Sequence, residues 1–170
     1  MEFQREVSCF LVPGGDILSI TTDDNSGGVA FDFFTIWEKL KKINCDEVCM
    51  IHSHPPSCPE MSGIDRNQVY GWVQALGKPI YFVIICDGEL ISYYCRRDKD
   101  NKSKVIRERI DIVYNEQFKE TIELIEFLSN YKYNLLSFKE NIAKELCEMC
   151  EMFKEIKPNV KIREQIAQDA

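Results

Sequence analysis

The chain has 170 residues, of which 45% are hydrophobic and 29% charged, and its net charge is −7. These values are typical of a globular protein with its own core, and they exclude a wholly disordered or collagen-like chain. The acidic excess lies in residues 1–95, with 13 acidic and 6 basic side chains, so we expect no nucleic-acid partner. No apolar run approaches the roughly 20 residues of a membrane helix, and the first residues lack a signal-peptide pattern. We therefore expect a soluble, cytoplasmic protein without a membrane partner.

Hydrophobic periodicity predicts a mixed α/β domain over residues 1–95. Short apolar runs bounded by turn residues predict five strands, over residues 7–12, 17–22, 47–51, 80–86 and 89–95. Apolar residues at helical spacing predict helices over 31–43 and 69–76, and Gly77 is a suitable end for the second. Asp87-Gly88 between the last two strands predicts a tight hairpin.

The pattern changes after residue 95. Residues 96–113 are rich in charge and poor in large apolar side chains, which predicts a charged connector. Residues 114–170 then form a helical extension, with apolar side chains at helical spacing from Tyr114 to Leu128 and from Leu135 to Ile156. We interpret it as a helical hairpin that packs on itself or on the first domain. The alternative is a coiled-coil surface for self-association or a protein partner.

The eight cysteines are expected to be free thiols rather than disulfides. Several lie inside apolar runs that predict strands, and buried thiols in a reducing compartment are the better interpretation. Cys45 with Cys49, and Cys147 with Cys150, are spaced like metal half-sites, but neither has a second pair at suitable spacing. Core packing is therefore favoured for these four side chains.

The only two histidines of the chain, His52 and His54, are two residues apart. They follow an apolar strand, and alternate positions of an extended strand project from one face, so the two imidazoles converge. Ser62 is a suitable N-cap for a helix with Asp65 in its first turn, which turns that carboxylate back toward the histidines. Two histidines and one aspartate with an open position are typical of a catalytic zinc site. Cys58 as a fourth ligand would indicate a structural site instead.

A catalytic zinc site also needs a proton acceptor. Zinc lowers the pKa of a water that it binds toward ~7, and a carboxylate must then take the proton and return it to a leaving amine. Four glutamates precede the histidines: Glu2, Glu6, Glu38 and Glu47. Glu6 begins the first strand and can lie beside the end of the histidine strand, whereas Glu47 lies well along that strand from the histidines. Spacing alone does not choose among the four.

Five positions and their spacing resemble the motif of the JAMM (MPN+) metalloproteases: His52-x-His54-Pro55 and Ser62-x-x-Asp65. In that family a glutamate at the start of an apolar strand precedes the motif by several tens of residues. Glu6, 46 residues before His52, is similar to it. The resemblance covers roughly residues 1–95. It implies a curved mixed β-sheet flanked by helices, to which the helical extension is added.

The resemblance also implies roles for the site residues. His52, His54 and Asp65 would bind one zinc ion per chain. Glu6 would be the general base and acid, and the Ser62 hydroxyl would help to hold the oxyanion of the tetrahedral intermediate. Family members cleave isopeptide or peptide bonds after ubiquitin or ubiquitin-like modifiers, or release cargo from sulfur-carrier relatives. The expected function is thus a zinc-dependent isopeptidase or peptidase whose substrate is a modifier conjugate.

Other interpretations of these residues stay open. A catalytically silent JAMM-like scaffold would bind a protein partner through the same domain or its helical tail. Two histidines and a carboxylate also describe Fe(II) oxygenase sites, although those usually take their second histidine from a distant strand. Acyl-serine hydrolysis is disfavoured, because Ser53 and Ser62 lack a nucleophile-elbow context. The simplest alternative is a pair of surface-loop histidines beside a proline.

Overall fold

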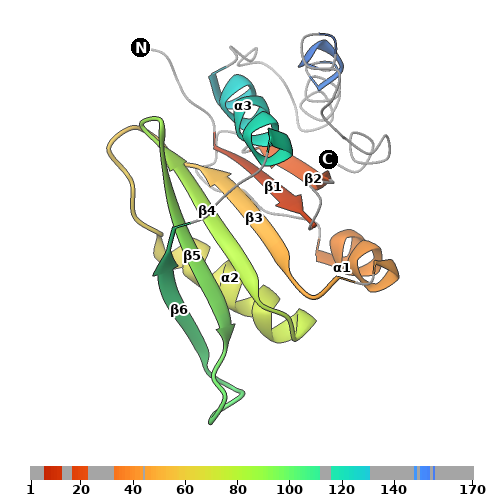
Figure 1. The fold of residues 1–170 in the computed structure, drawn as a ribbon, viewed down its shortest axis with the longest axis vertical. Helices are drawn as coiled ribbons and strands as arrows, with labels where there is room; N and C mark the ends of the chain where they lie inside the picture. The colour runs from red at the N-terminus through yellow and green to blue at the C-terminus, as the bar shows by residue number, and fades with distance from the viewer. Residues whose placement is uncertain are drawn as a thin grey trace.

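Six strands form one open mixed sheet with helices packed on both faces (Figure 1). The computed structural model describes residues 6–12, 17–22, 33–43, 45–111, 116–130, 148, 150–153 and 155. The strands, in the sheet order β2-β1-β3-β4-β5-β6, are β2 (Ile17–Thr22), β1 (Val7–Leu11), β3 (Val48–Ser53), β4 (Ile80–Cys86), β5 (Glu89–Arg97) and β6 (Val105–Ile110). The helices are α1 (Phe33–Lys42), α2 (Gly63–Leu76) and α3 (Glu116–Asn130).

The pairing of β1 with β3 brings distant parts of the chain together. β3 and β4 are parallel, with α2 in the crossover between them, and the other four strand pairs are antiparallel. Within the antiparallel β1–β3 ladder, Ser8 lies opposite His52. The residue before β1 therefore lies beside the residues that end β3.

Two hydrophobic clusters fill the two faces of the sheet. On one face α3 packs on β1 and β3, and its buried side chains meet those of the sheet and of a C-terminal segment: Ile122, Leu124, Ile125, Leu128, Cys150 and Phe153. On the other face, side chains of α1 and α2 form the second cluster with the sheet: Ile36, Leu40, Val69, Trp72 and Val73. Strand alternation places Ile51 on the α3 face and Met50 on the α2 face. His52, two residues after Met50, accordingly faces α2.

The prediction of a mixed α/β fold is confirmed as a sheet flanked by helices. The five strands predicted from apolar runs are present, although β3 continues to Ser53 and β5 to Arg97. Gly77 ends α2 in the left-handed region (φ 66°), and Asp87 and Gly88 form the β4–β5 turn with φ of 51° and 75°. The JAMM-like form of the sheet stays a prediction.

The connector predicted over residues 96–113 is wrong for a large part of its length. Residues Val105–Ile110 form β6, which pairs with β5 as an edge strand of the same sheet. The three central residues of β6, Arg107, Glu108 and Arg109, are exposed. An edge strand tolerates such charged side chains, and they protect its open edge from pairing with other chains. Because these side chains are charged, the segment lacks the apolar alternation that predicts a strand.

α3 confirms the first helix predicted in the 114–170 extension, and it packs on the sheet. Most of the second predicted helix, over 135–156, lies outside the described residues, so the helical hairpin and its use by a partner stay predictions. The seven cysteines within the described residues are free thiols, as expected, and Cys147 lies outside them. Within the described ranges, none of the helices combines the length and the apolar character that crossing a bilayer requires.

Candidate metal centre

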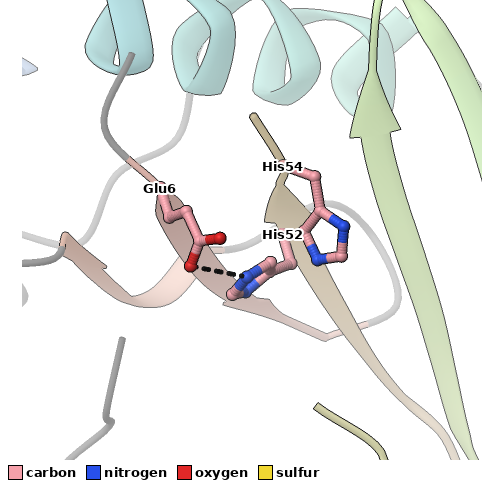
Figure 2. A group of neighbouring side chains, drawn as sticks. All are labelled: Glu6, His52 and His54. Atoms are coloured by element: carbon pink, nitrogen blue, oxygen red, sulfur yellow. Dashed lines mark ion pairs between the residues drawn. The ribbon is translucent and has the colours of Figure 1, made fainter. Parts of the chain in front are cut away.

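His52 lies near the end of β3 and His54 directly follows that strand, beside the start of β1. Figure 2 shows the two imidazoles beside the Glu6 carboxylate, which comes from the start of the neighbouring strand. The rings of His52 and His54 stand edge to face, with centroids 4.9 Å apart. The expected convergence of the two side chains is therefore confirmed, and both are buried, with 4% and 8% of their surface exposed.

His52 has one ring nitrogen engaged and one directed into the site. A hydrogen bond joins its Nδ1 to the hydroxyl of Ser8, the residue opposite it in the β1–β3 ladder. Its Nε2 lies 3.4 Å from Glu6 Oε2 and 3.7 Å from Asp65 Oδ1. This nitrogen is buried and has no hydrogen-bond partner among the described residues. Such an atom indicates a missing group, because buried polar atoms are rarely left unsatisfied.

His54 is held by a backbone carbonyl and a carboxylate. Its Nδ1 donates to the carbonyl of Cys58 at 2.8 Å, and its Nε2 lies 2.9 Å from Asp65 Oδ2. A carbonyl only accepts, so in a neutral ring the proton is on Nδ1 and the lone pair of Nε2 points toward the carboxylate. A positive charge is needed between Nε2 and Asp65, either a proton on the ring or a metal ion. The same arrangement is found in metal sites, where the second ring nitrogen of a ligand histidine is fixed by a carbonyl or carboxylate.

Asp65 is oriented by the capping box that begins α2. Its backbone N–H donates to Ser62 Oγ at 3.0 Å, and the Ser62 backbone N–H donates to Asp65 Oδ2 at 3.1 Å. This reciprocal pair turns the carboxylate back toward the histidines. The predicted capping role of Ser62 is confirmed, and so is the approach of Asp65 to the histidine pair.

Hydrogen bonds and neighbouring charges together outweigh the effect of burial on the pKa values of the His54–Asp65 pair. Burial raises the pKa of Asp65, but the hydrogen bond with His54, the charge of His52 and the Ser62 bonds outweigh it and lower the pKa from 3.8 to about 2. Burial also lowers the pKa of His54, and its hydrogen bonds with Asp65 and Cys58 raise it above 6.5 overall. Both shifts favour the charged forms, so in the absence of a metal ion a proton on His54 supplies the positive charge beside the Asp65 carboxylate.

Glu6 is positioned through the backbone of the next residue. The Val7 N–H donates to Ser53 Oγ at 2.8 Å, and the same hydroxyl lies 3.4 Å from the Val7 carbonyl oxygen. Ser53 lies between the two histidines and, by strand alternation, on the opposite face of the sheet. Its side chain thus joins the end of β3 to the start of β1. The Glu6 carboxylate, with 21% of the side chain exposed, can reach both the histidines and solvent.

One atom from each of three residues, Glu6, His52 and His54, lies close enough to the others to share a metal ion, since these atoms are within 4.8 Å of one another. Asp65 contacts both histidines and offers a second carboxylate. Imidazole nitrogens and carboxylate oxygens form a donor set that zinc accepts. The residues present therefore fit a divalent ion. The Cys58 thiol is exposed, and that residue serves the site through its carbonyl oxygen.

The structure separates Glu47 and Glu38 from this group. Glu47 lines a pocket with Tyr81 and Tyr94, Glu38 is exposed on α1, and Glu2 lies outside the described residues. Sequence reasoning missed Ser8, Ser53 and the Cys58 carbonyl as supports of the site. The signal for Ser8 and Ser53 is their place beside Glu6 and the histidines in paired strands, which requires the register to be known.

No family model, curated protein or solved structure matches this chain. The interpretation of the site therefore depends on its residues and their geometry.

Proposed function

We propose that this chain is a zinc-dependent hydrolase of isopeptide or peptide bonds of the JAMM (MPN+) type, acting after a ubiquitin-like modifier. One observation carries the proposal: the buried His52 Nε2 has no hydrogen-bond partner among the described residues and faces the carboxylates of Glu6 and Asp65. The motif over residues 52–65 supports it, because its spacing resembles that of the family.

We assign His52, His54 and Asp65 as the zinc ligands. Asp65 is the better ligand of the two carboxylates, since the capping box fixes it and only 8% of its side chain is exposed. Two histidines and one carboxylate leave a position open for water and substrate, as catalytic zinc sites require. Zinc bound there would lower the pKa of a water ligand enough to supply hydroxide near neutral pH.

Glu6 then serves as general base and acid. Its side chain is less buried than Asp65, and its Oε2 lies 3.4 Å from His52 Nε2, beside the ligand atoms. From this position the carboxylate accepts a proton from the attacking water and returns it to the departing amine. The Ser62 hydroxyl accepts a bond from the Asp65 N–H. Its own hydrogen is not used in that bond and can be donated to the developing oxyanion of the substrate.

The experiment compares two carboxylates of the site with one outside it. Zinc content and cleavage of a ubiquitin C-terminal fluorogenic amide, and of lysine-linked conjugates, are measured for Glu6→Gln, Asp65→Asn and Glu60→Gln. We expect Glu6→Gln to retain one zinc ion and to lose turnover by about 100-fold or more. Asp65→Asn should lose both zinc and turnover. Glu60 is exposed in the loop before α2, and Glu60→Gln should change neither.

Three outcomes contradict the proposal in different ways. Full activity of Glu6→Gln shows that the base is another group. Zinc retained by Asp65→Asn but lost from Glu6→Gln reverses the two assigned roles. Stoichiometric zinc with no turnover on any modifier conjugate favours the scaffold, for which the zinc-loaded Glu6→Gln protein should still capture intact conjugates.

A further inference from the structure

A pocket lies on the face of the sheet opposite the one that His52 faces. Its volume is about 560 Å³, within the range of pockets that hold small ligands. Among the described residues, seven line it, from the residue before β3 to the start of α3: Glu47, Cys49, Tyr81, Tyr94, Ile110, Asp111 and Phe118. Cys49 and Phe118 also pack against the cluster beneath α3, which places the pocket on the α3 face. We call it the tyrosine pocket.

Two tyrosines form its aromatic wall. Tyr81 of β4 and Tyr94 of β5 are directly opposite in the ladder, with ring centroids 4.9 Å apart and ring planes tilted by 42°. Phe118 adds a third ring at the start of α3. The face of an aromatic ring carries negative potential and attracts a cation within about 6 Å of its centre. If the cation carries an aliphatic chain, the carbons of that chain can pack against Ile110 and the edges of the rings.

Two carboxylates add negative charge, and no lysine or arginine is among the described residues that line the pocket. Within the described part of the chain, neither Glu47 nor Asp111 takes part in an ion pair. The neighbouring Arg96 is bonded to Glu108, with 3.1 Å between its Nη2 and Oε1. Burial, the hydrogen bond with Glu47 and the charge of Glu47 raise the pKa of Tyr81, so its hydroxyl keeps its proton. The pocket therefore repels anions and favours a cation.

The size and donors of the pocket exclude a simple metal site. Among the described residues, the group with donor atoms close enough to share a metal ion is Glu6, His52 and His54, on the other face. A pocket of about 560 Å³ lined by three aromatic rings suits a larger ligand with an apolar stem and a charged end. We infer that the tyrosine pocket binds an organic cation of side-chain size, namely the ammonium or guanidinium group of a lysine or arginine. This inference does not depend on the proposed zinc hydrolase.

The test uses blocked single amino acids as probes of the full-length protein. N-acetyl-lysine methylamide and its arginine counterpart are titrated against the protein, and the Tyr81 and Tyr94 ring signals are followed by NMR. N-acetyl-norleucine methylamide has a similar aliphatic stem without the charge and is the matched control. We expect saturable shifts with the two cationic probes and at least about fivefold weaker binding of the neutral one.

Variants then assign the binding to the pocket. Glu47→Gln should weaken binding of the cationic probes by about fivefold, and Tyr94→Leu by about threefold, because one removes the charge and the other a π-face. Glu89→Gln is the control with the same change in net charge, since Glu89 is exposed on the same strand as Tyr94 and does not line the pocket. Glu89→Gln should bind the probes as the wild type does. Far-UV circular dichroism of each variant checks that it is folded.

The inference is overturned if neither cationic probe shifts the tyrosine signals. It is equally overturned if norleucine binds as tightly as lysine, or if Glu89→Gln weakens binding as much as Glu47→Gln. A comparison with n-pentylammonium identifies the source of the cation. Tighter binding of the lysine probe indicates a protein partner that presents a basic side chain, and equal binding indicates a free amine.

Discussion

The two polar sites lie on opposite faces of one sheet and are built in different ways. At the histidine site, short hydrogen bonds from the backbone and neighbouring side chains orient each ring, and one nitrogen, His52 Nε2, has no such bond among the described residues. In the tyrosine pocket, two carboxylates face a space of about 560 Å³. The first arrangement suits a small ion that demands fixed ligands, and the second suits a larger cation held mainly by charge and aromatic contact.

The difference has a physical origin in the elements that meet at each site. The histidine site lies where a strand end, a strand start and a capped helix start converge, and such ends carry the free backbone groups that orient side chains. In the tyrosine pocket, Tyr81 and Tyr94 lie opposite each other in the β4–β5 ladder, where the backbone groups are used in strand pairing. Its charged groups are the carboxylates of Glu47 and Asp111, which lie just outside β3 and β6. Substitutions at the histidine site should therefore alter the geometry of the ligand atoms, and substitutions at the tyrosine pocket should alter its charge.

The largest effect should follow from removing a histidine. We expect His52→Ala to weaken zinc binding by more than about 100-fold, because a ligand nitrogen is lost from a site whose supporting bonds alone are worth 10- to 100-fold in affinity. Tyr81→Phe, on the opposite face, should bind zinc like the wild type. Zinc affinity is measured by competition with a chromophoric chelator. Equal affinity of wild type and His52→Ala would show that the histidines do not bind the ion.

The metal-free protein should show a pH dependence set by His54 and Asp65. The pKa of Asp65 is lowered from 3.8 to about 2 by folding, so its contribution of about 2 kcal/mol is present above pH 3.8 and is lost as the pH falls toward 2. The pKa of His54 is raised above 6.5, so its contribution is present below pH 6.5 and is lost as the pH rises through the folded value. With a chelator present, the His54–Asp65 pair should therefore stabilise the fold most between pH 3.8 and pH 6.5.

Denaturant unfolding at pH 5 and pH 8 measures this effect. Asp65→Asn should remove most of the difference between the two values, whereas Asp46→Asn, at an exposed position, should leave it unchanged. With zinc present, the free energy of unfolding should instead rise with pH above pH 6.5. A ligand imidazole must be neutral, so zinc binding improves as the proton is lost. A metal-free protein whose stability does not fall between pH 6.5 and pH 8 would contradict the His54–Asp65 interaction.

Local sequence patterns were enough to predict the arrangement of His52 with His54 and of Ser62 with Asp65. The spacing of His52 and His54 places them on one face through strand alternation, and the spacing of Ser62 and Asp65 produces the capping box through helix geometry. Both effects act within a few residues. The strands and helices of residues 1–95 were predictable for the same reason, because their apolar periodicity reports burial directly.

The remaining features depend on contacts between distant residues. Glu6 lies beside His52 because β1 and β3 pair in one particular register, and no local pattern specifies that register. β6 escaped prediction because an edge strand exposes charge where an inner strand is apolar. The tyrosine pocket was likewise not predicted, since Tyr81 and Tyr94 become neighbours of Glu47 and Asp111 only after four strands and the start of α3 assemble.

The smallest effect should come from Ser53, which supports the histidine site from the opposite face without belonging to it. Ser53→Ala removes the acceptor of the Val7 N–H and the side-chain link between β3 and β1. One hydrogen bond is worth about 1 kcal/mol, so we expect the Val7 amide to exchange with solvent about fivefold faster. Because Glu6 precedes Val7, turnover should fall by a similar factor, while zinc affinity stays within about twofold of the wild type.

Two further serine variants separate this positioning from a general loss of stability. Ser53→Thr keeps the hydroxyl and should restore both exchange and turnover. Ser92→Ala alters a buried serine of β5 that shares the α3 face, and it should leave the Val7 amide unchanged. Amide exchange followed by NMR is decisive even if no substrate is known. If Ser53→Ala leaves Val7 protection intact, then Glu6 is held by other contacts.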